Sequence, residues 1–346
     1  MSADRRRTGV LLIQLGTPNS PSAADVRRYL REFLGDRRVL DMPQIPHWLL
    51  LHLVILPFRP RRSAAAYASI WTHRGSPLLL HSRGLAEGLA KQLGEGFHVE
   101  LGMRYGEPSV KAALERLAQR DVDRLIALPL FPQYADSSTG SALAHLRELA
   151  CGMRQSSELA TIDDFYDHPG FIDSMAALVR TPLREFRPDH VLFSYHGLPE
   201  RQIRKSDASG SHCLSSDDCC EAIGAANRNC YRAQCFATTR ALAAALELET
   251  EPHSISFQSR LGRVPWIHPY TDHVLPELAS RGIRRLAVLC PSFVADCLET
   301  LEEIGIRARQ QWMSAGGKDF LMLPSLNSEP RWVEAVAAMI RDRGRC

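Results

Sequence analysis

The sequence has little lysine and no large excess of charge of either sign. Only Lys91, Lys111, Lys205 and Lys318 occur among 42 basic residues, and 39 acidic residues leave a net charge of +3. Because acidic and basic residues are interspersed, nucleic acid is not expected to be the main partner. With 45% hydrophobic residues among 346, the chain is too apolar to be disordered and long enough to bury two cores of ordinary size.

The sequence also lacks a hydrophobic run that could cross a bilayer. Its most apolar segment, residues 48–58, has eleven residues, whereas a spanning helix needs about 20. Two interpretations remain. The segment is either a buried helix of the first domain or an apolar lip, about residues 45–62, whose Arg59, Arg61 and Arg62 meet lipid headgroups. The second interpretation predicts peripheral contact with a membrane.

No secretory signal is recognisable at the start, where the polar sequence MSADRRRTG leads directly into an apolar run. We therefore expect a cytoplasmic protein, peripheral at the inner face of the cytoplasmic membrane under the lip interpretation. In that compartment the nine cysteines are expected to be reduced, so disulfides are a minor alternative for them.

Three apolar segments in each half end in Gly or Pro with polar or aromatic residues, and both halves carry them in the same order. VLLIQLGTP at residue 10 corresponds to VLFSYHGLP at 191, FHVELGMRYGEPS at 97 to HSISFQSRLGRVPW at 253, and RLIALPLFPQY at 124 to RLAVLCPSFVAD at 285. Short buried strands that alternate with amphipathic helices are typical of parallel β-α-β units. The repeat predicts an α/β protein of two similar doubly wound, Rossmann-like domains related by internal duplication.

The predicted domains follow from this repeat. Residues 1–180 form the first domain, which carries the lip and is completed by a C-terminal helix at 328–346. Residues 181–327 form the second domain, with a cysteine-rich insertion at about 206–236. Ligands of doubly wound sheets bind at the carboxyl ends of the strands. The cleft between the two halves is therefore the predicted place for chemistry.

The strand ends of the second half carry an imidazole and a file of carboxylates. His196 closes a predicted strand, where it can act as a base or a metal ligand, although a lone histidine there is more often structural. Farther along, a predicted helix begins with Asp296, Glu299, Glu302 and Glu303. Glu299 and Glu303 lie one turn apart on a common face, and Asp296 is on that face too. The alternative is that the acids only favour the positive end of the helix dipole. An imidazole beside aligned carboxylates suits a divalent metal, proton transfer or both.

The strand ends of the first half offer hydrogen-bond donors and flat apolar side chains. They are Leu15, Arg104, Tyr105 and Tyr134, with Trp266 as a further flat surface in the second half. A Ser/Thr cluster at 137–139 is at least as well explained as a helix cap as it is by contact with a ligand.

Five of the nine cysteines fall within 23 residues, in a polar insertion after the His196 strand. They are Cys213, Cys219, Cys220, Cys230 and Cys235. Such density in a reduced protein indicates a metal, either zinc or an iron–sulfur cluster. The spacings do not repeat a CxxC pair, which disfavours a zinc ribbon.

Together these motifs resemble the ferrochelatases, which insert ferrous iron into protoporphyrin IX in the last step of haem synthesis. The resemblance runs from about residue 8 to the C-terminal helix, in family order, through QLGTP, IWTHRGSPL, MRYGEPS, LPLFPQY with SSTGS, FSYHGLPER, FQSRLGRVPW with PYTD, and DCLETLEEI. It implies two Rossmann-like domains around a porphyrin cleft and a lyase that forms protohaem. The alternatives are a coproporphyrin chelatase and a non-catalytic haem or iron–sulfur sensor on the same fold.

The resemblance also implies roles for single residues. His196 matches the active-site histidine and Glu299 its paired carboxylate, both in contact with the substrate iron. Asp296 and Glu303 match acids that pass protons or metal along the helix. Cys297 stands where animal members have histidine, which weakens a metal route through a second imidazole. The residues expected to contact porphyrin are Leu15, Arg104, Tyr105, Tyr134 and Trp266.

Some ferrochelatases hold a two-iron two-sulfur cluster, and the insertion resembles the bacterial class that ligates it from within the second domain. This implies a 2Fe–2S cluster on Cys213, Cys220, Cys230 and Cys235, with Cys219 as the alternative ligand. The implied partners are porphyrin and ferrous iron, with no nucleic acid and with membrane contact through residues 45–62. A monomer and a homodimer are both compatible with the sequence.

Overall fold

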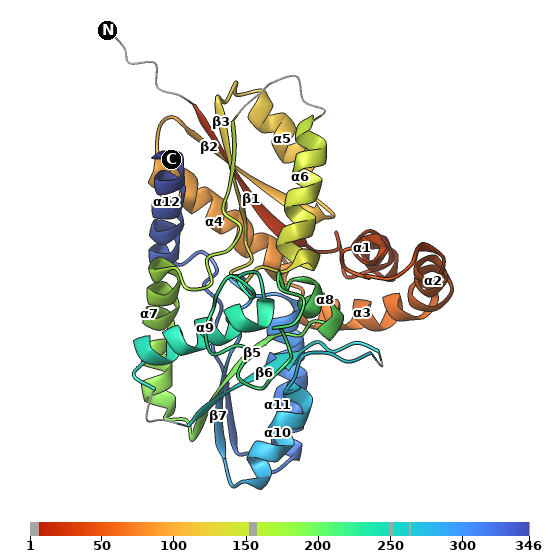
Figure 1. Ribbon diagram of the computed structural model, residues 1–346, viewed down its shortest axis with the longest axis vertical. Coiled ribbons are helices and arrows are strands. Elements are labelled where there is room, and N and C mark those ends of the chain that lie inside the picture. The colour runs from red at the N-terminus through yellow and green to blue at the C-terminus, as the bar shows by residue number, and fades with distance from the viewer. Residues whose placement is uncertain (1–6, 152–157, 249–251, 263, 346) are drawn as a thin grey trace. The chain divides into compact units, whose positions relative to one another are not determined.

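A computed structural model describes residues 7–151, 158–248, 252–262 and 264–345 (Figure 1). The chain divides into two compact units. Unit 1 comprises Met1–Phe131, Asp136–Asp164 and Asn327–Cys346, and unit 2 comprises Pro132–Ala135 and Phe165–Leu326. The boundary expected at residue 180 falls inside helix α7 of unit 2, Pro169–Phe186.

Unit 1 is built on a parallel sheet with the strand order β2-β1-β3-β4. Its strands are β1 (Thr8–Gly16), β2 (Phe97–Tyr105), β3 (Arg124–Pro129) and β4 (Glu158–Thr161). Its helices are α1 (Ala23–Gly35), α2 (Gln44–Leu49), α3 (Leu56–Ile70), α4 (Pro77–Leu93), α5 (Val110–Ala118), α6 (Ser141–Cys151) and α12 (Pro330–Arg345), with π-helices η1 (Leu50–Ile55) and η2 (Asp136–Gly140). Helices α4 and α12 cover one face of the sheet, and α5 and α6 cover the other (Figure 1).

Unit 2 repeats this plan, with the strand order β6-β5-β7-β8 and parallel pairing throughout. Its strands are β5 (His190–His196), β6 (His253–Gln258), β7 (Arg285–Leu289) and β8 (Asp319–Met322). Besides α7, its helices are α8 (Glu200–Lys205), α9 (Tyr231–Ala245), α10 (Thr271–Ser280) and α11 (Arg309–Ser314), with the π-helix η3 (Glu299–Ala308). The predicted duplication of a doubly wound α/β domain is confirmed.

The central strand of each sheet is buried on both faces. Val10, Leu11, Leu12 and Ile13 of β1 have no exposed surface, and neither has Phe193 of β5. Strands covered by helices on both sides need apolar residues at every position, which is why these segments show continuous hydrophobic runs.

A glycine lies at the end of each central strand, where the neighbouring backbone leaves no room for a side chain. Gly16 of β1 has φ +126°, and a Cβ there would lie 1.8 Å from the carbonyl oxygen of Tyr105. A Cβ on Gly197, directly after β5, would lie 2.8 Å from the carbonyl oxygen of Gln258. Only glycine allows the neighbouring backbone to approach so closely. The two strand ends are therefore built alike.

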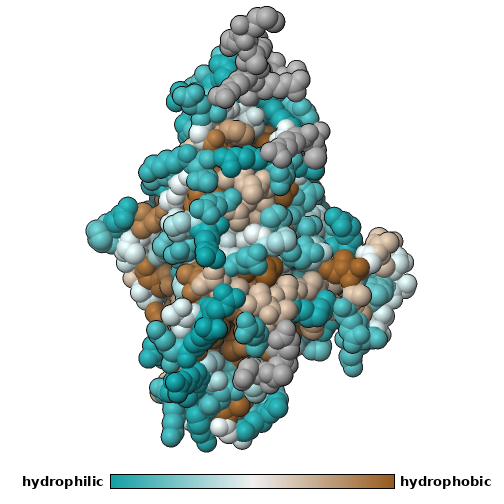
Figure 2. All heavy atoms as spheres, turned by 90° about the vertical axis from the view of Figure 1, so that its left-hand side faces the viewer, coloured by the Kyte–Doolittle hydropathy of each residue, from teal (hydrophilic) through white to brown (hydrophobic). Residues whose placement is uncertain are grey.

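Among the described residues, no helix is both long and apolar enough to cross a membrane. On the face drawn in Figure 2, hydrophobic residues are interspersed with hydrophilic ones.

Candidate active site

His196 is the last residue of β5 and lies half-buried at the carboxyl edge of the unit 2 sheet. Its backbone N–H donates to Ser292 Oγ at 3.1 Å, and its Nδ1 lies 2.6 Å from the carbonyl oxygen of Gly197. Because a carbonyl oxygen can only accept, Nδ1 carries the proton of the neutral ring, and the lone pair is on Nε2. Nε2 is therefore the atom that can accept a proton or bind a metal.

Gln258, which lies within the motif FQSRLGRVPW but was not singled out as a site residue, joins the His196 and Glu299 segments. It is 3% exposed and pairs with His196 across β5 and β6. Its backbone carbonyl accepts the N–H of Gly197 at 2.8 Å, and its Nε2 donates to the carbonyl of Glu299 at 3.0 Å. Its Oε1 accepts the hydroxyl of Ser194 at 2.8 Å. A buried amide satisfied in this way fixes both segments. A glutamine at a buried strand end was the available sequence signal.

The helix that carries the acidic file is the π-helix η3, whereas the one-turn spacing of Glu299 and Glu303 assumed the geometry of an α-helix. Bonding from i to i+5 widens each turn, so residues three apart are turned farther from each other than in an α-helix. π-Helices are rare and are often found at functional sites. Apolar periodicity does not distinguish the two helix types, which is why the sequence did not indicate it.

The four acids are held by different neighbours. Asp296 precedes the helix and is 7% exposed. Its Oδ1 accepts the hydroxyl of Thr300 at 3.0 Å and the N–H of Ser325 at 3.4 Å. Glu302 pairs with Arg307, whose Nε lies 2.9 Å from both carboxylate oxygens. Asp296 and Glu302 are thus held by local structure.

Glu303 and Glu299 have different surroundings. Both oxygens of Glu303 bind Ser259, through its N–H at 2.8 Å and its hydroxyl at 2.5 Å. Ser259 has φ +66°, a conformation that non-glycine residues rarely adopt, so Glu303 stabilises this turn. Glu299 is half-buried beside Cys297. Burial, and then the Glu299 charge and a hydrogen bond to it, raise the pKa of the Cys297 thiol, which therefore remains a protonated donor.

Trp266 lies next to the His196 turn. It is 9% exposed and forms a β-bridge with Pro199. A Cβ on Gly197 would lie 3.2 Å from its ring atom Cε3, so the indole packs against this backbone. Its Nε1 is buried and has no hydrogen-bond acceptor among the residues that the structure describes. Unit 2 thus brings together His196, Trp266, Gln258 and the start of η3.

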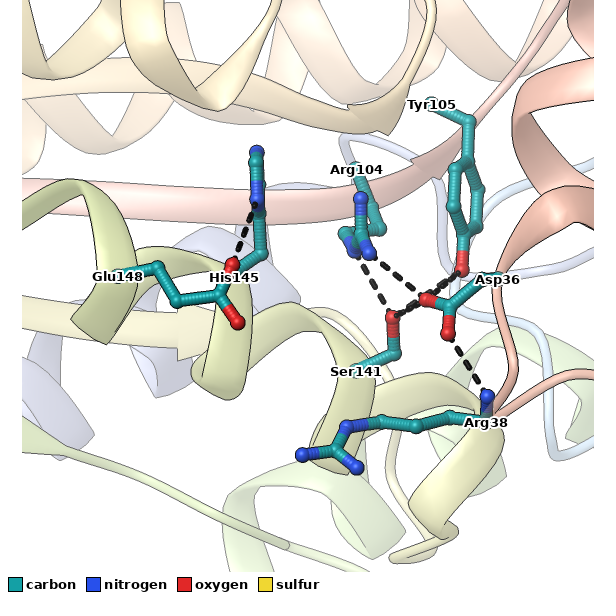
Figure 3. Close-up of polar contacts among 7 residues, drawn as sticks. All are labelled: Asp36, Arg38, Arg104, Tyr105, Ser141, His145 and Glu148. Atoms are coloured by element: carbon teal, nitrogen blue, oxygen red, sulfur yellow. Dashed lines mark hydrogen bonds and ion pairs between the residues drawn. The ribbon is translucent and has the colours of Figure 1, made fainter.

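Arg104 and Tyr105 end β2 and belong to a buried network in unit 1 (Figure 3). The guanidinium of Arg104 pairs with Asp36 at 2.7 Å and donates through Nε to Ser141 Oγ at 2.8 Å. The phenol of Tyr105, which is 2% exposed, donates to Asp36 at 2.8 Å. Burial raises the pKa of Tyr105. The positive charge of Arg104 is therefore offset by Asp36, a residue that the motifs did not indicate.

The other predicted contacts lie at strand ends in both units. Leu15 is half-buried beside the end of β1, where Gly16 pairs with Tyr105. Tyr134 lies in unit 2, and its backbone N–H donates to Gln234 Oε1 of α9 at 2.6 Å. The Ser/Thr cluster forms the turn η2 before α6, and its Thr139 is fully buried.

The sequence matches the family model for ferrochelatase over residues 7–344. A ferrochelatase of Coxiella burnetii (strain Dugway 5J108-111) is 51% identical over 338 residues, which cover 98% of this chain and 94% of the relative. A ferrochelatase of Legionella pneumophila (strain Lens) is 46% identical over 337 residues, with 97% and 99% covered. The chain belongs to the ferrochelatase family. Ferrochelatases are metal chelatases, a class of lyases.

Solved structures of other chelatases share the fold of this ferrochelatase. SirB from Bacillus subtilis with Fe³⁺ aligns with a TM-score of 0.55 and 10% identity over 97% of this chain and 95% of its own. CbiX, described as the terminal enzyme for biosynthesis of siroheme in denitrifying bacteria, aligns with a TM-score of 0.50 and 13% identity, with 96% and 98% covered. At such identities the likeness concerns the fold alone.

The cysteine-rich insertion of this ferrochelatase gathers buried thiols before α9. Cys219 Sγ and Cys220 Sγ are 3.8 Å apart, and Cys230 hydrogen-bonds to both Cys213 and Cys220. Cys235 is hydrogen-bonded to Tyr231 and lies close enough to Cys220 to interact with it electrostatically. The predicted cluster is not confirmed, because within the described residues no three His, Cys, Asp or Glu side chains are arranged to hold a metal ion.

The apolar segment of this ferrochelatase runs through α2, η1 and the start of α3. It buries one face through Leu51, Ile55 and Leu56 and exposes the other. The exposed apolar side chains are Ile45, Trp48, Leu49, Leu53, Val54 and Phe58, which are 43–76% exposed. The segment is therefore not an ordinary buried core helix. We refer to residues 45–62 as the lip.

Proposed function

We propose that this ferrochelatase inserts ferrous iron into protoporphyrin IX, with His196 as the first proton acceptor. Two pyrrole N–H bonds break as iron–nitrogen bonds form, two protons leave, and the iron stays ferrous. The observation that supports His196 most directly is its Nδ1–H···O=C bond to Gly197, which presents the basic Nε2 at the strand end. A base with a lone pair in a fixed direction is what deprotonation of a bound ring requires.

The acids beside His196 are proposed to divide the remaining work. Glu299 is at the first position of η3, and Gln258 holds its backbone at 3.0 Å. We assign the second proton, or a contact with the entering iron, to this carboxylate. Glu303 and Asp296 would pass protons onward. Binding energy from the macrocycle would bend the ring and expose its nitrogen lone pairs.

The proposed porphyrin contacts are Leu15, Arg104, Tyr105, Tyr134 and Trp266. Arg104 offers less positive charge to a substrate than an unpaired arginine would, because its Nη2 lies 2.7 Å from Oδ2 of Asp36. This favours protoporphyrin, which has two propionates, over coproporphyrin, whose four carboxylates need more unpaired cations. Anaerobic assays with ferrous iron and each porphyrin test the choice. A higher kcat/KM with coproporphyrin would contradict the proposal.

The cysteine insertion is proposed to hold a 2Fe–2S cluster on Cys213, Cys219, Cys220 and Cys230. These thiols are buried, and contacts between them link all four. Donors also surround them, with Arg232 Nη1 3.0 Å from Cys220 Sγ and the N–H of Leu214 3.4 Å from Cys219 Sγ. Thiolate ligands with nearby hydrogen-bond donors fit such a cluster. When bound, it supplies one-electron redox chemistry, which iron insertion does not use.

Cys219→Ser and Cys235→Ser form a matched pair that tests the ligand set. Cys219→Ser should lose the cluster, because four thiolates are required, whereas Cys235→Ser should retain about two irons per chain. Iron, sulfide and visible absorption of anaerobically purified protein provide the readout. Loss of iron in Cys235→Ser alone would restore Cys235 as a ligand, and zinc without sulfide in the unmodified chain would refute the cluster.

The lip is proposed to contact the cytoplasmic face of a membrane and to receive the apolar porphyrin from it. Its exposed side includes Trp48 and Phe58, and Arg61 and Arg62 follow on α3. Apolar side chains flanked by arginines are typical of helices that lie at the surface of a bilayer.

Leu49→Glu combined with Leu53→Glu should reduce recovery with liposomes and raise the apparent KM for porphyrin about tenfold, since each buried leucine contributes ~1.5–3 kcal/mol. The kcat should change little, because neither side chain reacts. Both positions are exposed, at 43% and 58%, so the variant should fold. Met313→Glu, at a site 45% exposed on α11, is the control. Unchanged liposome binding and KM in the double variant would rule out the lip's role.

A further inference from the structure

We propose that Asp36 is a positioning residue for porphyrin binding, because it ties the lip to the end of β2 that carries Arg104 and Tyr105. The inference rests on the proposed porphyrin contacts of those two residues. Asp36 directly follows α1, and its side chain is 10% exposed. Hydrogen bonds from Ser141, the Arg38 N–H and Tyr105, together with the Arg104 charge, outweigh burial and lower the pKa of Asp36.

The two carboxylate oxygens of Asp36 serve different parts of unit 1 (Figure 3). Its Oδ2 accepts Arg104 Nη2 at 2.7 Å, Tyr105 OH at 2.8 Å and Ser141 Oγ at 2.5 Å. Its Oδ1 accepts the backbone N–H of Arg38 at 2.8 Å, in the turn that leads toward the lip. Oδ2 thus accepts hydrogen bonds from residues of β2 and α6, while Oδ1 binds the segment between α1 and α2.

Helix α1 connects this carboxylate with the lip. His47 of α2 places Nε2 2.7 Å from the carbonyl oxygen of Leu34, and Tyr29 packs edge-on against Tyr67 of α3 with ring centroids 6.4 Å apart. The helices that form the lip therefore pack against α1, and Asp36 is the residue that follows the end of α1.

Two further contacts fasten the end of α1 to the end of β2. Glu32 Oε2 accepts the N–H of Gly106 at 2.9 Å, and the ring of Phe33 packs on Tyr105 with centroids 5.2 Å apart. The Asp36 ion pair is the charged member of this set. Because it is largely buried, its loss leaves a guanidinium without a counterion.

Asp36 also fixes the direction of the Arg104 guanidinium. Nε and Nη2 are bound by Ser141 and Asp36, and the group lies 4.5 Å from the centroid of the Tyr105 ring. Nη1 makes no hydrogen bond to any residue in the described ranges. A held guanidinium with one unused nitrogen can bind a substrate carboxylate without further ordering, which favours affinity.

Asp36→Asn keeps the size of the side chain but removes its charge and one acceptor. We expect the KM for porphyrin to rise about tenfold while kcat stays within about threefold, as for a loss of uniform binding. Backbone amides of residues 37–56 should exchange hydrogen faster. The control is Asp25→Asn, at the other end of α1, where Asp25 is hydrogen-bonded to Ser20 and Arg28. This variant should change neither the KM for porphyrin nor the rate of hydrogen exchange.

A double variant keeps the test decisive if Asp36→Asn folds poorly. Asp36→Asn with Arg104→Gln removes both charges, and its KM should lie within about twofold of the worse single variant, because the two residues act as one unit. The inference would be overturned if the effects of the two single substitutions on KM multiplied in the double variant. It would also be overturned if Asp36→Asn had the KM and the hydrogen exchange of the wild type. A wild-type KM in Arg104→Gln would instead refute the proposed porphyrin contact.

Discussion

His196→Ala is expected to lower the rate of iron insertion about 100- to 10,000-fold, the usual cost of losing a general base. Porphyrin binding should stay close to that of the unmodified chain, because the imidazole acts on the pyrrole protons or the metal and contributes little to holding the ring. Anaerobic turnover and porphyrin titration by fluorescence quenching measure the two quantities separately.

His190→Gln is the matched control, since His190 lies at the opposite end of the same strand. Burial lowers the pKa of His190 to about 4, and its Nε2 lies 2.8 Å from Ser254 Oγ. It is therefore a neutral structural histidine, and glutamine can keep a polar contact there. If His196→Ala kept more than about a tenth of the wild-type turnover, the loss of rate would be smaller than a general base contributes. His196 would then be removed from the mechanism.

Glu299→Gln should lower kcat about 100-fold, because it preserves shape while removing the charge that is proposed to accept a proton or meet the iron. The same substitution at Glu302 should cost less than about threefold, since an ion pair with the half-exposed Arg307 is worth only ~0–1 kcal/mol. Steady-state kinetics of both variants provide the comparison.

The pair is informative because both residues lie in the first turn of η3. Glu302 is bound by Arg307, whereas Glu299 lies beside Cys297. Equal losses at the two positions would show that the functional face of the π-helix has been assigned wrongly.

The sequence predicted the architecture well because strand burial and strand ends leave local signatures. Continuous apolar runs followed by glycine marked β1 and β5, and the structure places Gly16 and Gly197 where a neighbouring carbonyl leaves no room for a Cβ. His196 could be found for the same reason, since it stands directly before such a glycine at a strand end.

Features that depend on distant partners were not predictable. Asp36 is hydrogen-bonded to Arg104 and Ser141, which are 68 and 105 residues away along the chain. No local sequence pattern predicts contacts over such separations. Gln258 gains its importance from Glu299, 41 residues farther on. The π-helical form of η3 was missed because its sequence is compatible with an ordinary amphipathic helix.

The cysteine insertion shows a third limit. Spacing alone left five candidates for four positions, and the choice among them depends on which neighbours each thiol has in the folded chain. Cys235 lies inside α9 and bonds to Tyr231, whereas Cys219 lies 3.8 Å from Cys220. The proposed ligand set therefore takes Cys219 in place of Cys235.

A single-turnover experiment under anaerobic conditions tests the central claim most directly. Protein, protoporphyrin IX and ferrous iron are mixed in a weakly buffered solution, and haem absorption and proton release are followed together. The unmodified chain should form haem with two protons released per iron, and His196→Ala should form almost none on the same timescale. Porphyrin that binds and stays metal-free with the unmodified chain, or equal haem formation by both proteins, would contradict the account.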